Sequence, residues 1–299
     1  KRFDTGVPRK LFDAIKDIEM DMDLPASQHL YGREDIWPLL ERMYTGYIAE
    51  PSQSNWRGSW RSCFAVVAFL SEHYDVAREQ LEALQWQPWA NCLTGWGVEL
   101  SLLPLEVAAR TGPWSNQVSQ AEAAYRQGDP AKAFALHSEL GKADNLDQQT
   151  REFLRRRLAV LDIEQQWAKG AWVELLPRQD NDPAWVMLYG QPRRLPDGSL
   201  EVESAPDGYL LYNLARLGTN FVAKVEYDVI RASRQQTQAG LIMGLPEYDG
   251  CDWHILQLKG NAPGDGSAYY GAGGAPLEIS RQVPLNPDHN VFTVKFRRG

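Results

Sequence analysis

Apolar residues recur at helical spacing through the first 169 residues of the chain. In segment 35–49 the apolar stripe follows Asp35, a candidate helix cap, and consists of Ile36, Leu39, Leu40, Met43 and Tyr44. The same period predicts helices over residues 8–23, 35–49, 58–74, 75–86, 98–110, 116–127, 130–140 and 146–167. This half of the chain is therefore expected to be all α.

The pattern changes from helical spacing to alternation near Gly170. Phe221, Ala223 and Val225 alternate with Lys224 and Glu226, as expected of a strand with one buried and one solvated face. Alternation predicts strands over residues 185–189, 199–203, 209–212, 221–229, 239–243, 253–258 and 291–296. We therefore expect two domains, an all-α domain over 1–169 and an all-β antiparallel domain over 170–299.

Two stretches of the helical half resemble each other, residues 65–77 and 121–133. Each has alanines that let two antiparallel helices approach closely, and the second has a Gly128-Asp129 turn that the first lacks. This pattern resembles the tetratricopeptide repeat, whose helical hairpins stack and bind proteins. The equivalent Ala77 and Ala133 are 56 residues apart, against about 34 in that family. The resemblance implies irregular hairpin repeats and protein partners.

The β half resembles the laminin-G/concanavalin-like jelly roll, in particular bacterial domains of the keto-disaccharide hydrolase type. The matching segments are 197–200, 221–227, 240–243, 253–258 and 289–294. The resemblance implies a jelly-roll sandwich that recognises a protein or a glycan, and it slightly favours an extracytoplasmic or envelope location. Such domains have further strands after the last one seen here, and residue 1 is Lys. We therefore expect this chain to be part of a larger bacterial multi-domain protein.

Composition and charge exclude several classes of protein. The formal net charge is −8, against the basic balance of a nucleic-acid binder. The longest apolar run, 63–70, has eight residues, whereas a membrane helix needs about 20. The cysteines, Cys63, Cys92 and Cys251, form no CxxC motif, which argues against a structural zinc site. A bridge between Cys63 and Cys92 is left open.

The sharpest acidic cluster is Glu247, Asp249 and Asp252. Its E-x-D-x-x-D spacing approaches the E-x-D-x-x-E of jelly-roll glycoside hydrolases, in which paired carboxylates cleave the glycosidic bond. Asp249 and Asp252 are alternatively candidates for a calcium site, the only cofactor considered. Pro246 and the Asp249-Gly250 pair favour a third interpretation, a solvated turn.

Aromatic residues near a glycine-rich segment are the candidate ligand-binding residues. Residues 260–276 hold six glycines and are expected to form a loop, in which Tyr269 and Tyr270, with Trp253 nearby, could stack on sugar rings. The alternative is a long connection without a ligand. With no convincing catalytic motif, we expect a non-catalytic interaction module; the alternative function is a glycan-active hydrolase.

Overall fold

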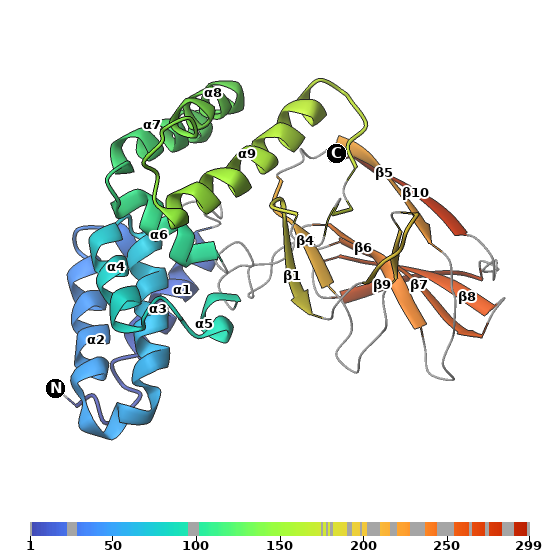
Figure 1. Cartoon of the computed structure of the whole chain (residues 1–299). Helices are drawn as coiled ribbons and strands as arrows, with labels where there is room; N and C mark the ends of the chain where they lie inside the picture. Colours follow the sequence, from blue (N-terminus) through green and yellow to red (C-terminus); the bar gives the residue numbers. More distant parts are fainter. Residues whose placement is uncertain are drawn as a thin grey trace. The chain divides into compact units, whose positions relative to one another are not determined.

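The computed structural model describes residues 2–22, 29–94, 102–174, 176–177, 179, 182–189, 193–197, 199–201, 210–215, 220–227, 237–243, 254–262, 265–272, 275–282 and 290–297. The chain divides into two compact units, Lys1–Arg216 and Leu217–Gly299. The last helix ends at Ala168 and the first strand begins at Trp185 (Figure 1). The domain boundary at residue 170 stays a prediction.

The described helices of the first unit agree broadly with the apolar spacing. They are α1 (Lys10–Asp21), α2 (Trp37–Ala49), α3 (Arg57–Leu70), α4 (Tyr74–Ala83), α5 (Ala90–Thr94), α6 (Leu103–Thr111), α7 (Ser115–Arg126), α8 (Pro130–Leu140) and α9 (Gln148–Ala168), with short 3₁₀ turns at Leu30–Gly32 and Pro51–Trp56. The cap predicted at Asp35 is wrong. Ile36 occupies the N-cap position of α2, and the Asp35 carboxylate instead pairs with the Arg33 guanidinium at 2.8 Å.

Helices α3 and α4 form one antiparallel hairpin, and α7 and α8 form a second. Ala77 and Ala133 belong to the alanines that are expected to allow close helix approach, and both have no exposed surface. Both hairpins reverse in the same way. The N–H of His73 donates to the Ala68 carbonyl at 2.8 Å, and the N–H of Asp129 donates to the Ala124 carbonyl at 3.0 Å.

A left-handed residue makes each of these reversals. Gly128 has φ +82° in the second hairpin, and Glu72, 56 positions earlier, has φ +60° in the first. A left-handed residue after the last turn lets the chain leave a helix while its final carbonyls stay hydrogen-bonded. The first hairpin therefore forms the same turn without the glycine that the sequence lacks there.

The apolar core of the helices is split at α6. One cluster of buried side chains runs from α1 to Val107 of α6. A second begins at Ala109 of α6 and continues into α7, α8 and α9, and a smaller third lies among α7, α8 and α9. Residues two positions apart on a helix do not share a face. Helix α6 therefore packs one face on the first hairpin and another on the second.

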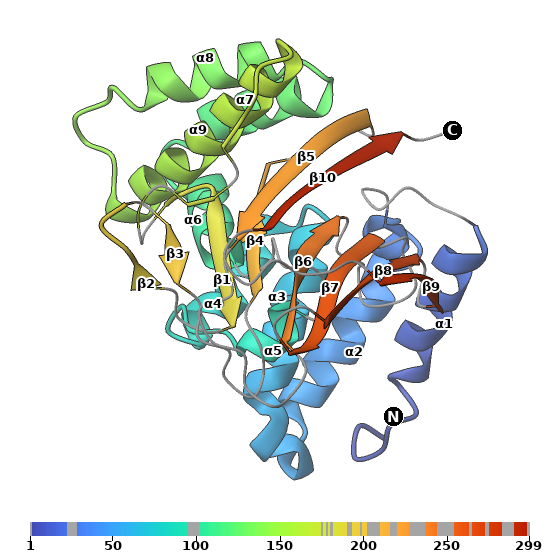
Figure 2. The same cartoon turned by 90° about the vertical axis from the view of Figure 1, so that its right-hand side faces the viewer.

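The strands among the described residues form four separate antiparallel sheets. In the first unit β1 (Trp185–Tyr189) pairs with β4 (Leu210–Asn213), and β2 (Arg193–Arg194) pairs with β3 (Leu200–Glu201). In the second unit β5 (Asn220–Tyr227) pairs with β10 (Asn290–Arg297). The remaining strands form a meander in chain order (Figure 2): β6 (Thr237–Met243), β7 (His254–Ala262), β8 (Asp265–Ala272) and β9 (Ala275–Gln282).

The predicted jelly-roll sandwich is wrong for the residues described. A jelly roll has eight strands in two facing sheets linked by Greek-key connections. The described strands of the second unit instead make consecutive hairpins and one separate ladder, and helix exceeds strand in the described chain as a whole. Alternation identifies residues that fit a strand, but it carries no information on which strand pairs with which.

Two local β predictions had different outcomes. The loop predicted over 260–276 is wrong, because most of it is the end of β7 and the whole of β8. Backbone ladders need no side chains, so glycines do not prevent pairing there. The predicted pairing of 291–296 is confirmed: β10 runs antiparallel to β5, with Phe292 opposite Val225 and Phe296 opposite Phe221.

Candidate functional site

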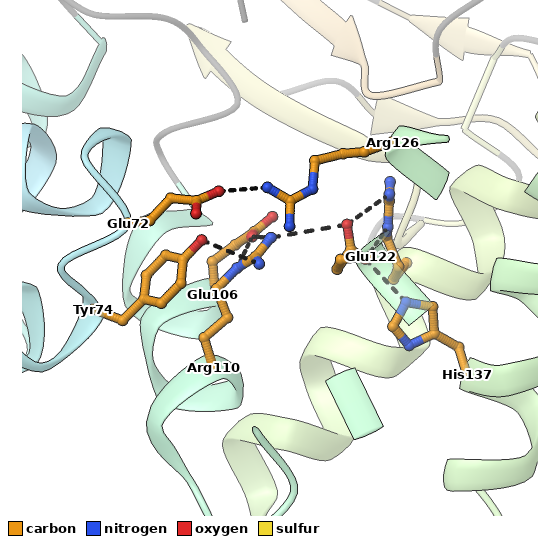
Figure 3. Close-up of polar contacts among 8 residues, drawn as sticks. Glu72, Tyr74, Glu106, Arg110, Glu122, Arg126 and His137 are labelled. Atoms are coloured by element: carbon orange, nitrogen blue, oxygen red, sulfur yellow. Dashed lines mark hydrogen bonds and ion pairs between the residues drawn. The ribbon is translucent and has the colours of Figure 1, made fainter. Parts of the chain in front are cut away.

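The most concentrated polar chemistry of the described chain lies inside the first unit, where α6, α7, α8 and α9 meet. The carboxylate of Glu122 on α7 is its centre (Figure 3). Nε2 of His137 on α8 lies 2.9 Å from that carboxylate. Because a carboxylate only accepts, Nε2 is the donor. Arg157 on α9 donates two hydrogen bonds to the two carboxylate oxygens, at 2.7 and 2.9 Å.

Burial and charge act in opposite directions on Glu122. Its side chain is only 8% exposed and that of His137 is fully buried. Burial alone would raise the pKa of Glu122, but the hydrogen bond from His137 and the charges of Arg157 and Arg110 together lower that pKa to about 2. The carboxylate is therefore ionised over the whole neutral and mildly acidic range.

Arg110 carries the network from the second hairpin to the first. From α6 its guanidinium lies 3.8 Å from Glu122 and 3.3 Å from Glu106. It donates a hydrogen bond to the Tyr74 hydroxyl at 3.4 Å and lies over the Tyr74 ring, 5.1 Å from its centroid. Burial opposes the Arg110 charge, but Glu106, Tyr74 and Glu122 outweigh it and raise the pKa.

A second link between the hairpins lies at the surface. Arg126 at the end of α7 forms an ion pair with Glu72, the left-handed residue of the first reversal (Figure 3). Both side chains are more than half exposed. Exposed pairs contribute little to stability. The buried contacts of Arg110 are therefore the stronger connection.

The two hairpins differ at the centre of this network. At the offset of 56 residues, Glu122 corresponds to Val66, and His137 corresponds to Leu81. Val66 and Leu81 are both fully buried. An apolar pair thus fills the position in the first hairpin that a hydrogen-bonded polar pair fills in the second. Hairpin packing alone does not require the polar pair.

The network is built for internal contacts. The charge of Glu122 faces His137, Arg157 and Arg110. The side chains of these three residues are at most 16% exposed. A catalytic acid or base must reach substrate, and the buried His137 has no path to one. Its Nδ1 has no hydrogen-bond partner among the described residues. The arrangement fixes α7, α8 and α9 relative to one another.

A hollow of about 260 Å³ opens on the outside of the same hairpin. Its lining comes from the start of α7 and the end of α8, which meet at the end of the hairpin away from the Gly128 turn. The lining combines apolar side chains with the exposed amides and carboxylate of Gln117, Gln120 and Glu139. The lining residues are Trp114, Gln117, Gln120, Leu136, Glu139, Leu140 and Ala143. It is thus an apolar hollow with a polar rim.

The site residues predicted from sequence are elsewhere. Glu247, Asp249, Asp252 and Trp253 lie outside the described residues, so their catalytic, calcium-binding and ligand-binding roles stay predictions. Tyr269 and Tyr270 lie in strand β8, where the backbone pairs them with Gln257 and Leu256 of β7 respectively. Their role in ligand binding also stays a prediction.

Two further observations concern metals and membranes. Within the part of the chain that is described, no group of three or more His, Cys, Asp or Glu side chains is arranged to hold a metal ion. None of the helices described for residues 2–22, 29–94 and 102–174 has the length and apolarity of a membrane-crossing segment.

Sequence patterns did not point to the Glu122 network. The run Arg155-Arg156-Arg157 is typical of a solvated helix face, but the side chain of Arg157 is only 16% exposed and binds Glu122. No local motif links residues 15 and 35 positions apart. The available signal was the repeat itself, because the 56-residue offset places Glu122 and His137 at positions that are apolar in the first copy.

Comparisons of the chain with protein-family models, with curated proteins and with solved structures found no match. The resemblance to tetratricopeptide repeats therefore stays a prediction. The geometry of the described residues carries the functional argument.

Proposed function

We propose that the helices of the first unit form a non-catalytic protein-interaction module, and that the hollow on α7 and α8 receives an apolar side chain of a protein partner. The observation that carries the proposal is the hollow in a stack of helical hairpins. Trp114 and Leu136 line it and stay partly open to solvent, and the buried Leu140 also contributes to its lining. Stacked hairpins commonly present such surfaces to proteins.

The composition of the hollow favours a peptide segment as partner. Interfaces commonly combine an apolar centre with a polar rim. Here Gln117, Gln120 and Glu139 supply rim donors and acceptors around the apolar lining. These groups match the backbone and polar side chains of a peptide whose apolar residue enters the hollow.

The buried network supports the proposal by holding the hollow in shape. Gln117 and Gln120 project from α7, and Leu136 and Leu140 from α8. The contacts of Glu122 join those two helices from behind and attach both to α9. A surface held in its binding shape loses less conformational freedom on association.

The three candidate carboxylates for glycan hydrolysis lie outside the described residues. The described residues therefore provide no observation in favour of that alternative. The buried polar groups Glu122, His137 and Arg157 are paired with each other. Protein interaction is therefore the function that the described geometry supports best.

The test uses a random peptide library displayed on phage and selected against the full chain. Gln120→Trp fills the hollow from its rim, and the matched control Gln149→Trp places the same ring on an exposed residue at the start of α9. We expect fluorescence polarisation to show selected peptides binding Gln120→Trp at least about tenfold more weakly than wild type, or about 1.4 kcal/mol, with Gln149→Trp unchanged. No enriched peptide, or equal affinity for all three proteins, would refute the proposal.

A further inference from the structure

The segment after α4 returns to the first half of α3 and is fixed there. The N–H of Trp89 donates to the Ser62 hydroxyl at 3.0 Å. The Trp89 indole lies so close to Gly58 that a Cβ on that glycine would come within 2.8 Å of Nε1. Leu93 of α5 is 4% exposed and belongs to the first apolar cluster. Helix α5 is therefore held in a defined position against α3.

This packing brings two free cysteines together, Cys63 of α3 and Cys92 of α5. The Cys92 sulfur lies 3.3 Å from the Ser59 hydroxyl. Ser59 and Cys63 are four residues apart on α3, so their side chains share a face of that helix. The Cys92 sulfur also lies 3.8 Å from the carbonyl oxygen of Ser59, so it lies against the turn of α3 that carries Cys63.

The surroundings of the two thiols act on their pKa values in opposite directions. The neighbouring Cys63 thiol and the Ser59 hydroxyl lower the pKa of Cys92 against the opposing effect of burial. The neighbouring Cys92, together with burial, raises the pKa of Cys63. Cys92 is thus the more acidic of the two thiols and the better attacking sulfur.

We infer that Cys63 and Cys92 are a redox-active dithiol, with Cys92 as the attacking sulfur and Cys63 as the resolving sulfur, which hydrogen peroxide converts to an intramolecular disulfide. This inference is independent of the proposed function, because α5 and the hollow on α7 and α8 share no residue. The disulfide would join α5 covalently to α3.

The chemistry balances with one peroxide. The Cys92 thiolate attacks one peroxide oxygen, the O–O bond breaks, and the products are a sulfenic acid on Cys92 and hydroxide, which takes up a proton as water. The Cys63 sulfur then attacks the Cys92 sulfur, so that an S–S bond forms and the S–O bond breaks. The leaving hydroxide takes the Cys63 proton as a second water. Two thiols lose two electrons, and one peroxide gains them.

The test uses the full chain with Cys251→Ser, so that Cys63 and Cys92 are the remaining thiols. After hydrogen peroxide treatment we expect the intact mass to fall by two hydrogens, both thiols to resist alkylation, and a digest to contain a peptide linking residues 63 and 92. Dithiothreitol should reverse all three changes. Persistent free thiols, over-oxidation of Cys92 without the link, or disulfides between chains would overturn the inference.

A second measurement assigns the roles of the two sulfurs. The pH profile of Cys92 alkylation by iodoacetamide should have its midpoint below 9.0, the ordinary pKa of a cysteine thiol. Cys63→Ala removes the donor and should move the midpoint upward, whereas Cys63→Ser keeps a donor and should leave it low while abolishing the disulfide. A midpoint that is the same in Cys63→Ala and in the parent chain would show that Cys63 does not activate Cys92.

Discussion

Replacing Glu122 by Gln removes the charge at the centre of the buried network with little change in shape. The neutral amide can still accept a hydrogen bond, but Arg157 and His137 lose the carboxylate that faces them at 2.7 and 2.9 Å. Removing one partner of a buried ion pair leaves the other charge without compensation. We therefore expect Glu122→Gln to destabilise the folded state strongly.

The size of the effect follows from the pKa of Glu122. A change from the ordinary value of 4.5 to about 2 corresponds to about 3 kcal/mol in favour of the ionised folded state. Buried ion pairs that lose one partner typically cost about 3–5 kcal/mol. The free energy of unfolding should thus fall by about 3 kcal/mol or somewhat more in Glu122→Gln.

The sign of the pH dependence is fixed by the direction of this shift. Because the folded-state pKa lies below the unfolded value, the contribution of Glu122 is fully present above pH 4.5 and is lost as the pH falls toward about 2. The difference in stability between wild type and Glu122→Gln should therefore be constant near neutrality. It should shrink through that acid range.

The assay is denaturant unfolding followed by helical circular dichroism, at neutral pH and at several acid pH values. The matched control is Glu82→Gln in the Arg78–Glu82 pair of α4, where the contact is as short, 2.7 Å, but the Glu82 side chain is 51% exposed. Exposed pairs of this kind are worth less than about 1 kcal/mol. Equal small losses in both variants would refute the view that Glu122 stabilises the second hairpin.

A third variant asks whether charge itself is needed. Glu122→Val with His137→Leu reproduces the apolar pair of the first hairpin, and Arg157→Met removes the arginine that donates two hydrogen bonds to Glu122. Arg110 keeps its contact with Glu106. Replacing a whole buried ionic group by apolar residues is often neutral. We expect this triple variant to recover most of the stability that Glu122→Gln loses, and a triple variant less stable than Glu122→Gln would contradict that explanation.

Two smaller predictions concern the hairpins. Ala133→Leu, or Ala77→Leu in the first hairpin, should overpack a fully buried helix contact and cost about 1–3 kcal/mol; unchanged melting temperatures in both would remove the basis for the close helix approach. Gly128→Ala should cost about 1–2 kcal/mol because φ is +82° there. Gly141→Ala, at φ −59°, is its control and should be neutral or stabilising by about 0.4–1 kcal/mol, and equal melting temperatures for the two glycine variants would show that Gly128 is not strained.

The sequence predicted the helices well where a local signal sets each boundary. Helix α8 begins at Pro130, and the side chain of Asp129 accepts a hydrogen bond from the N–H of Lys132. Both features can be read from the sequence, and the predicted range 130–140 is the observed one. The cap predicted at Asp35 is wrong because the Asp35 carboxylate accepts hydrogen bonds from Arg33 instead of from the helix N-terminus. Residue propensities do not show which of two possible partners a side chain binds.

Features that depend on distant partners could not be predicted in the same way. Alternation located β5 and β10, but their pairing joins segments more than sixty residues apart, and nothing in either segment specifies the other. The polar network is a similar case, because Arg110 and Glu122 meet only after α6 and α7 have packed. The turn of the first hairpin is a different case. Its sequence has no glycine, but Glu72 takes the left-handed conformation and the turn still forms.

The split of the apolar core at α6 has a consequence for cooperativity. Repeat-like helical structures unfold in units whose coupling depends on the contacts between neighbours. Here Val107 ends one apolar cluster and Ala109 begins the next, while Arg110 and its partners Tyr74 and Glu122 cross between the hairpins. Helix α6 thus couples the two parts in two ways, through its apolar contacts in both clusters and through the buried polar contacts of Arg110. Protonation of Glu122 as the pH falls toward about 2 weakens only the second kind of coupling. We therefore expect the two parts to unfold less cooperatively in strong acid than near neutral pH.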